Sequence, residues 1–316
     1  MVSTPPGRKD ELHPEDAICY ARTINEGITV TDPILPHVTI PMFPHDKRIA
    51  VTTSWDDGTT FDRPVVEMLN KLNMKGTFNL NSGTLRRTGK PAPDGRGRID
   101  ACEVTALYAG HEVAVHTVTH PMPHLVSLTQ FAREVIDDRK ALEDLVGYPV
   151  RGMAYPNGVF NQRIIDLLRS LEIVYARTTQ NEPKCFPVEE PLAWPATMHM
   201  FGTSPAPLGE RWEQCYNNTR FRSAFFVWGH SYEFDRTNRW DDLYTLFTPL
   251  ANKPDAWYCT NIELWDYHYA RQRLVLGANL KTAYNPSAIP VTVKVDDNLI
   301  EAHPGVVTQL VTPDRA

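Results

Sequence analysis

Two acidic residues and two histidines carry the strongest chemical signal in the sequence. Asp56 and Asp57 stand side by side after an apolar run, and His116 and His120 follow another apolar run. One carboxylate and two imidazoles form a ligand set that binds a divalent metal ion and leaves a coordination position for water. The second carboxylate would be close enough to take a proton from that water. The pattern therefore predicts a metal-dependent hydrolase of an amide or an ester.

A third histidine extends this pattern. His230 follows an apolar run at residues 225–229, and an imidazole in that position can serve as a general acid near neutral pH. Glu233 is close enough in sequence to orient its ring. Each signal also has a structural alternative: Asp-Asp-Gly is a common turn, and a lone histidine is often a core residue.

The elements that would position these residues alternate in type from residue 48 onward. Short apolar runs alternate with helical periods, which favours strands joined by crossover helices. The predicted strands are residues 49–53, 76–80, 112–115, 152–155, 173–177, 197–200, 224–228 and 257–260. The predicted helices are residues 62–72, 127–147, 161–171, 211–216, 240–250 and 263–273. Asp62, Ser127 and Asn161 are the expected caps of the first three, and Gly147 is expected to end the second.

About eight strands alternating with helices predict an α/β fold, a (β/α) barrel that is distorted or incomplete. The candidate residues all follow strands: the aspartates the first, His116 and His120 the third, Asn157 the fourth and His230 the seventh. Barrel enzymes build their sites at the carboxyl ends of the strands. We therefore expect these side chains to converge.

Three regions are expected along the chain. Residues 1–46 form a Pro-rich N-terminal extension, residues 47–273 form the barrel, and residues 274–316 form a small β appendage. In the appendage, Val291, Val293 and Val295 alternate with polar residues before an Asp-Asp-Asn turn, which predicts a hairpin packed on the barrel.

Composition limits the classes of function. The 316 residues are 42% hydrophobic and 22% charged, as in globular proteins, and the net charge of -6 offers no footprint for nucleic acid or an anionic membrane. No apolar stretch approaches the roughly 20 residues that span a bilayer. Five cysteines without a Cys-x-x-Cys motif predict reduced thiols, and the polar N-terminus lacks a signal-peptide core. We therefore expect a cytoplasmic protein.

Four segments, in this order, resemble the motifs of the polysaccharide deacetylase superfamily, the NodB-type deacetylases of carbohydrate esterase family 4, as an atypical branch. They are Ser54-Trp55-Asp56-Asp57-Gly58, His116-Thr117-Val118-Thr119-His120, Tyr155-Pro156-Asn157-Gly158 and Trp228-Gly229-His230. The resemblance covers roughly residues 48–270. It implies a distorted barrel of about seven strands and a divalent metal, with Zn²⁺ as first choice and Co²⁺, Ni²⁺ or Mn²⁺ as alternatives. It also implies removal of an N-acetyl or other acyl group from an amino-sugar or oligosaccharide.

The resemblance also implies a role for each residue. Asp57, His116 and His120 would bind the metal, Asp56 would be the general base, and His230 would protonate the departing amine. The backbone N–H of Asn157 would stabilise the oxyanion. The arginine of the family's third motif is Ala154 here, and Arg151 is the candidate to replace it. The remaining candidates for substrate contact or support are Trp55, Tyr155, Trp228 and Glu233.

Two alternatives stay open at this point. The first is a deformylase or amidase that acts on a small or lipid-linked substrate. The second is a metal-containing carbohydrate-binding protein with weak catalysis, which the missing arginine favours. The expected partners are a carbohydrate or an N-acylated small molecule, with no nucleic acid or membrane. A homo-oligomer through the N-terminal arm is a further hypothesis.

Overall fold

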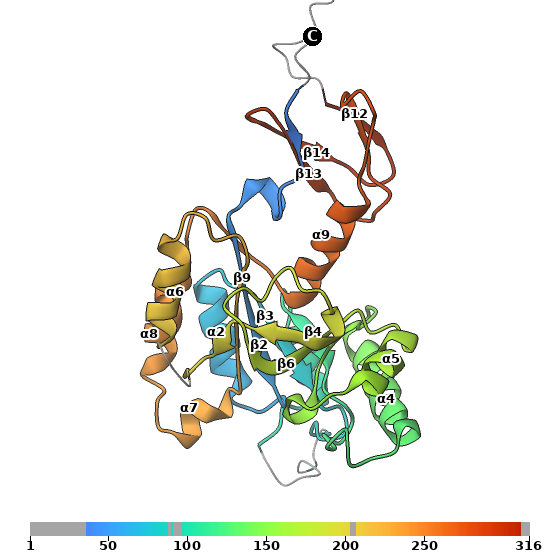
Figure 1. Cartoon of the computed structure of the whole chain (residues 1–316). Coiled ribbons are helices and arrows are strands. Elements are labelled where there is room, and N and C mark those ends of the chain that lie inside the picture. Colours follow the sequence, from blue (N-terminus) through green and yellow to red (C-terminus); the bar gives the residue numbers. More distant parts are fainter. Residues whose placement is uncertain (1–35, 88–89, 91–96, 203–206, 311–316) are drawn as a thin grey trace, which may run out of the picture. The chain divides into compact units, whose positions relative to one another are not determined.

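The alternation of apolar runs and helical periods produces an α/β fold built on a mostly parallel sheet (Figure 1). The computed structural model describes residues 36–87, 90, 97–202 and 207–310. Most of the expected N-terminal extension lies outside the described residues, and so does Cys19. Among the described residues, Cys185, Cys215 and Cys259 are buried free thiols.

The main sheet has the strand order β7-β6-β5-β4-β3-β2-β9-β8. One further strand, β10, pairs with β2 outside this order. All of these pairs are parallel. The strands are β2 (Ile49–Asp56), β3 (Gly76–Leu80), β4 (Glu112–Val115), β5 (Gly152–Ala154), β6 (Tyr175–Asn181), β7 (Trp194–Ala196), β8 (Met198–His199), β9 (Ala224–Gly229) and β10 (Ala256–Tyr258).

The two ends of this order are consecutive in the chain. Only Thr197 separates β7, which pairs with β6, from β8, which pairs with β9. The backbone N–H of Glu182 donates to Ala196 O on one side, and that of Thr197 donates to Phe226 O on the other, each at 2.8 Å. This bent segment connects the two edges of the sheet, and the described strands form a distorted barrel with seven strand positions.

Two predicted strands differ from the observed ones. The run at 197–200 lies within the bent segment formed by β7 and β8, which begins at Trp194. The run at 257–260 is observed as β10, which pairs only with the start of β2 and occupies no strand position of its own. All eight predicted runs are therefore observed as strands of the main sheet, and seven of them occupy the strand positions of the barrel, as the resemblance implied.

Helices surround this sheet (Figure 1). They are α2 (Asp62–Lys71), α3 (Val104–Leu107), α4 (Leu128–Val146), α5 (Gln162–Ser170), α6 (Leu208–Asn217), α7 (Tyr232–Arg236), α8 (Asp242–Phe247) and α9 (Asn261–Arg273). Short 3-10 turns occur at η1 (Pro44–Asp46), η2 (Ala101–Glu103), η3 (Pro156–Gly158), η4 (Pro191–Ala193) and η5 (Thr248–Leu250).

The expected caps of α4 and α5 are present. Ser127 Oγ accepts a hydrogen bond from Gln130 N, Asn161 Oδ1 accepts one from Ile164 N, and Gly147 ends α4 with φ 75°. The sequence had suggested Asp62 as the cap of α2, but Asp62 is the first residue of this helix and does not cap it. Its carboxylate is buried and accepts hydrogen bonds from Tyr108 and Ser231.

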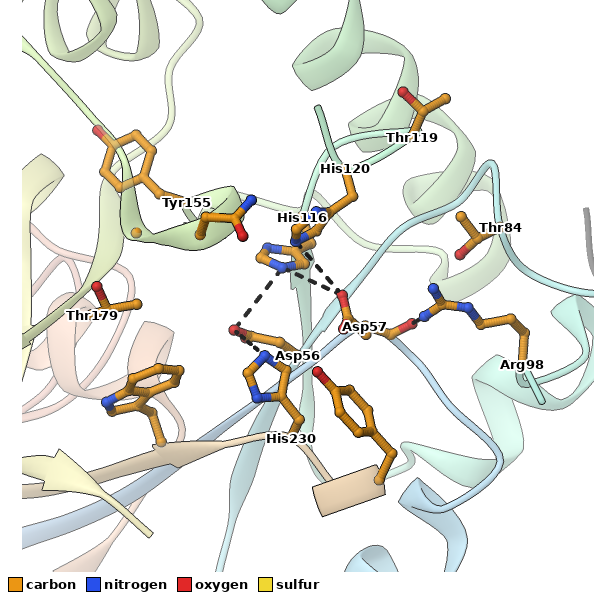
Figure 2. A pocket seen from close by; sticks show the side chains of 14 residues that line it. Asp56, Asp57, Thr84, Arg98, His116, Thr119, His120, Tyr155, Thr179 and His230 are labelled. Carbon is orange, nitrogen blue, oxygen red and sulfur yellow. Dashed lines mark hydrogen bonds and ion pairs between the residues drawn. The ribbon is translucent and has the colours of Figure 1, made fainter. Parts of the chain in front are cut away.

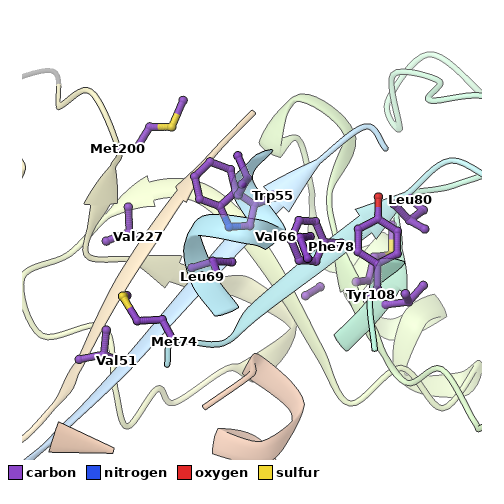
Figure 3. Close-up of a cluster of buried hydrophobic side chains, with 14 of the residues drawn as sticks. Val51, Trp55, Val66, Leu69, Met74, Phe78, Leu80, Tyr108, Met200 and Val227 are labelled. Atoms are coloured by element: carbon purple, nitrogen blue, oxygen red, sulfur yellow. The ribbon is translucent and has the colours of Figure 1, made fainter. Parts of the chain in front are cut away.

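A continuous apolar core lies between the sheet and the helices around it (Figure 3). Trp55, Val65, Leu69 and Phe78 contribute fully or almost fully buried side chains. Burial of one such side chain contributes about 1.5–3 kcal/mol. This rigid layer fixes the strand ends, and the strand ends fix the polar loops that follow them.

The C-terminal residues form two small antiparallel sheets. One contains β11 (Val275–Leu276), β12 (Thr282–Tyr284) and β15 (Val307–Gln309). The other contains the predicted hairpin, β13 (Val291–Val295) with β14 (Asn298–Ala302), and β1 (Val38–Thr39) pairs with β13. The end of the expected N-terminal extension is thus a strand of the appendage's sheet. In the described part of the chain, no helix is long and apolar enough to cross a membrane.

Candidate metal centre and catalytic pocket

The loops at the carboxyl ends of the strands enclose a cavity of about 660 Å³ (Figure 2). The six residues expected to act as metal ligands, general base, general acid or oxyanion donor all line it. Its lining residues are Asp56, Asp57, Thr84, Arg98, His116, Thr119, His120, Tyr155, Asn157, Gly158, Thr179, Trp228, His230 and Tyr232. Side chains from residues far apart in sequence therefore meet in one place.

Asp57, His116 and His120 lie together at the base of this cavity. Asp57 Oδ1 is 3.7 Å from His116 Nε2 and 3.8 Å from His120 Nε2, and one ligand atom from each residue lies within 4.8 Å of the others. His116 Nδ1 donates to Ala154 O at 2.8 Å, so Nε2 carries a lone pair toward Asp57. An unprotonated ring nitrogen and a carboxylate at this spacing fit a divalent cation such as Zn²⁺.

The backbone of these loops adopts an unfavourable conformation. Asp57, Thr117, His120 and Asn157 have φ values of 81°, 70°, 58° and 56°. Such left-handed geometry in residues other than glycine costs about 1–3 kcal/mol and persists only where the surroundings impose it. Arg98 donates to the carbonyl of Asp57, and Asn81 Nδ2 donates to the carbonyls of His116 and Thr117 at 2.6 and 2.9 Å.

Asp56 lies beside this group but has different partners. Its Oδ1 accepts a hydrogen bond from Asn79 Nδ2 at 2.8 Å, and its Oδ2 contacts the guanidinium of the fully buried Arg177. Burial by itself raises the pKa of Asp56. The charges of Arg177, His116 and His230 outweigh it and lower that pKa below its ordinary value. Asp56 is therefore an ionised carboxylate at neutral pH.

His230 faces the other side of Asp56. Its Nε2 is 3.9 Å from Asp56 Oδ2, and its Nδ1 is 3.5 Å from Glu233 Oε2. Nδ1 makes no hydrogen bond of good geometry, so the interaction with Glu233 is mainly electrostatic. Burial lowers the pKa of His230, but Glu233 and Asp56 outweigh it and raise this pKa above its ordinary value. The imidazole is thus biased toward its protonated, acidic form.

His199, His230 and Glu233 form a second group of ligand-type side chains. His199 Nδ1 accepts a hydrogen bond from Phe201 N at 3.3 Å, so the proton of a neutral ring is on Nε2. That Nε2 lies 2.9 Å from Glu233 Oε2 and donates to it. A metal ion would need the same nitrogen unprotonated. We therefore interpret this group as a hydrogen-bond network around Glu233.

Arg151 does not replace the arginine of the family motif. It forms a two-pronged ion pair with Asp266 of α9 at 3.0 and 2.6 Å, at the amino end of β5 and so at the opposite end of the barrel from the cavity. Arg177 of β6 contacts the base carboxylate instead. The sequence held one signal for it, a single charge within the apolar run at 173–177.

Substitution of Arg177 tests its influence on Asp56. In Arg177→Gln the pKa of Asp56 should rise by about 1–3 units, because an opposite charge in contact lowers a carboxyl pKa by that amount. The ionised base is present above its pKa and is lost as pH falls through it. The acidic limb of the kcat/KM profile should therefore move to higher pH. Arg177→Lys keeps the charge, and Arg151→Gln removes an arginine elsewhere. In both variants the acidic limb should stay at its wild-type pH. An unmoved limb in Arg177→Gln would contradict this influence.

The aromatic candidates have different positions. Trp228 and Tyr155 line the cavity, although the Tyr155 ring is almost fully buried and its hydroxyl donates to Leu192 O at 2.7 Å. Of the two roles expected for Trp55, only support remains, because its side chain is 1% exposed and packs against Phe234 and Phe247. Sequence reasoning assigned no role to several other lining residues. Thr84, Arg98 and Thr179 lie outside the motifs, and Thr119 and Gly158 lie within them.

Part of the chain matches a known protein family. Residues 44–176 match the family model for polysaccharide deacetylase. A provisionally named polysaccharide deacetylase from Mycobacterium smegmatis has a similar fold, with 17% identity, a TM-score of 0.57, and coverage of 75% of this chain and 96% of that chain. No curated protein matches the sequence. The match places residues 44–176 in the polysaccharide deacetylase family, as the motifs had indicated, and the fold is shared with a solved structure over most of the chain.

Two further solved structures resemble this chain less closely. An acetyl xylan esterase from Clostridium thermocellum, crystallised with a cobalt ion, has 14% identity and a TM-score of 0.46, covering 69% of this chain and 90% of that chain. The peptidoglycan deacetylase PdaC from Bacillus subtilis has 17% identity and a TM-score of 0.44, covering 73% of this chain and 95% of that chain.

Proposed function

We propose that the protein is a metal-dependent hydrolase that removes an N-acetyl or related acyl group from an amino-sugar or oligosaccharide. The catalytic unit would comprise residues 47–273. The observation that carries the proposal is the position of Asp56. This ionised carboxylate lies between the Asp57–His116–His120 group and the imidazole of His230, at 4.0 Å from His116 Nε2 and 3.9 Å from His230 Nε2.

Asp57, His116 and His120 would bind the divalent ion, with Zn²⁺ the first choice for this ligand set. When bound, such an ion polarises the acyl carbonyl and makes water acidic enough to lose a proton near neutral pH. Asp56 would accept the proton of the attacking water, and Arg177 and Asn79 would keep this carboxylate ionised and fixed in orientation.

Two groups would act on the reacting amide. His230, on the opposite side of Asp56, would donate its proton to the departing nitrogen. The backbone N–H of Asn157 would donate to the developing oxyanion, and the left-handed backbone at this residue supports such a role, since strained geometry of this kind is common at active sites. The side chain of Trp228 would form a wall of the substrate cavity.

Release of acid from defined substrates tests this function. The purified protein would be incubated with Zn²⁺ and a panel of N-acetylated, N-formylated and unmodified amino-sugars and oligosaccharides, and acetate and formate would be quantified. We expect acetate release from at least one N-acetylated sugar. Formate release alone would instead support the deformylase alternative. Binding of sugars without release of either acid would support the binding protein, although Arg177 supplies the arginine whose absence had favoured that reading.

Glu233 should control the alkaline limb of the pH profile. His230 is active as an acid while protonated, so the rate falls as pH rises through its pKa, which Glu233 helps to raise. In Glu233→Gln this pKa should drop and the falling limb of kcat/KM should move to lower pH. Arg236→Gln is a matched control, because Arg236 binds the other carboxylate oxygen at 3.1 Å and its loss leaves the charge of Glu233 in place. A limb that stays in place in Glu233→Gln would contradict the assignment.

A further inference from the structure

The loop that carries both histidines needs support from outside. Thr117 and His120 have positive φ values of 70° and 58°, and His116 precedes them at the end of β4. Each such residue costs about 1–3 kcal/mol, and the conformation persists only where neighbouring groups impose it. The loop 116–120 would otherwise relax, and the two imidazoles would no longer face Asp57.

Two carboxylates on α4 provide this support. Glu134 and Asp138 are four residues apart, so they lie on one face of the helix, one turn from each other. We call them the α4 carboxylate pair. Neither lines the cavity described above.

Asp138 is fully buried and connects two loops. Its Oδ2 accepts a hydrogen bond from His116 N at 3.0 Å, and its Oδ1 accepts one from Ser82 N at 2.7 Å. The loop after β3 thereby packs against the loop after β4. Contact between them is close: Gly83 N donates to Val118 O at 3.1 Å, and a Cβ on Gly83 would lie 2.6 Å from that oxygen.

Glu134 binds the other end of the histidine loop. Its Oε2 accepts a hydrogen bond from Thr119 N and its Oε1 accepts one from Thr119 Oγ1, both at 2.8 Å. Charged acceptors make stronger hydrogen bonds than neutral ones. The α4 carboxylate pair therefore fixes the backbone at residues 116 and 119, directly at one histidine and next to the other.

We propose that Glu134 and Asp138 are positioning residues for the metal site. By binding residues 116 and 119 from one helix, they fix both imidazoles toward Asp57 before a metal ion arrives. This inference rests on the proposed metal site and goes beyond it, since neither carboxylate is a ligand. Loss of an outer-shell partner of a metal ligand typically costs about 10- to 100-fold in metal affinity.

The test measures Zn²⁺ affinity by competition with a chromogenic chelator. It compares the wild type with Glu134→Gln, Asp138→Asn and the control Asp137→Asn, an exposed carboxylate on the same helix. We expect Glu134→Gln and Asp138→Asn to weaken binding by about 10- to 100-fold, and Asp137→Asn to leave it unchanged. The Tm of the metal-free proteins is measured alongside, because a purely structural role would lower Tm without changing the affinity of the folded protein.

Thr119→Ala completes the design and avoids dependence on the buried Asp138, whose variant could fail to fold. If Glu134 acts through Thr119, the Thr119→Ala change should weaken Zn²⁺ binding in the wild type and add little in Glu134→Gln. If the wild type binds Zn²⁺ and Glu134→Gln binds it equally tightly, this inference alone is overturned. A wild type that binds no Zn²⁺ overturns the metal site and this inference together.

Discussion

Asp56→Asn should lose most of its turnover and keep its metal ion. An asparagine at this position accepts the hydrogen bond from Asn79 but cannot take a proton from water. Removal of a general acid or base usually costs about 10² to 10⁴ in rate. The metal content should stay at the wild-type level, because the three proposed ligands do not include Asp56. Turnover and elemental analysis of the same preparation measure both quantities.

A matched control separates catalysis from folding. Asp56→Asn leaves the buried guanidinium of Arg177 without its carboxylate partner, and breaking a buried ion pair can cost about 3–5 kcal/mol. Asp266→Asn breaks the pair with Arg151 far from the cavity and should keep full activity. A folded Asp56→Asn protein without metal would refute the separation of base from ligands. A folded, metal-loaded and fully active one would remove Asp56 from the mechanism.

His116→Ala should lose metal and activity together. The His116 side chain is 1% exposed, and its Nε2 is directed at Asp57 while its Nδ1 is occupied by Ala154 O. Without this imidazole the site keeps one carboxylate and one histidine, too few for a stable zinc site. Both metal affinity and rate should fall by more than the about 10- to 100-fold that loss of an outer-shell partner costs.

His111→Ala serves as the control for this prediction. His111 is also buried and directly precedes β4, so it lies at the opposite end of the strand that His116 follows. Its Nδ1 accepts a hydrogen bond from Gly76 N at 3.1 Å, a contact of the fold only. This variant should be less stable and should still bind one metal ion per chain. Stoichiometric metal in His116→Ala, by elemental analysis, would remove His116 from the ligand set.

The convergence of the aspartates and histidines could be predicted from sequence. Each of these residues follows a strand, and the carboxyl ends of parallel strands meet at one end of a barrel. This prediction does not depend on which strands are neighbours in the sheet, because the carboxyl ends of all the strands face the same cavity. The caps at Ser127 and Asn161 were equally local, since a cap depends on residues three positions apart.

Two candidate residues lie away from the cavity for geometric reasons. Arg151 is three residues from Ala154, but a strand rises about 3.3 Å per residue, so three residues correspond to about 10 Å. That distance takes Arg151 to the other end of β5, where Asp266 binds it. Trp55 is adjacent to Asp56, and adjacent residues of a strand face opposite sides. Asp56 faces the barrel interior, and Trp55 packs against the helices outside.

The sequence by itself determined the α/β class, the order of the strands along the chain and the set of side chains that meet at their ends, because these follow from local periodicity and from the polarity of parallel strands. Only the tertiary structure decided which charge accompanies Asp56, and how the loop with the two histidines is fixed. Arg177, Glu134 and Asp138 act through contacts across neighbouring elements. Such contacts depend on distances in space that residue spacing does not encode.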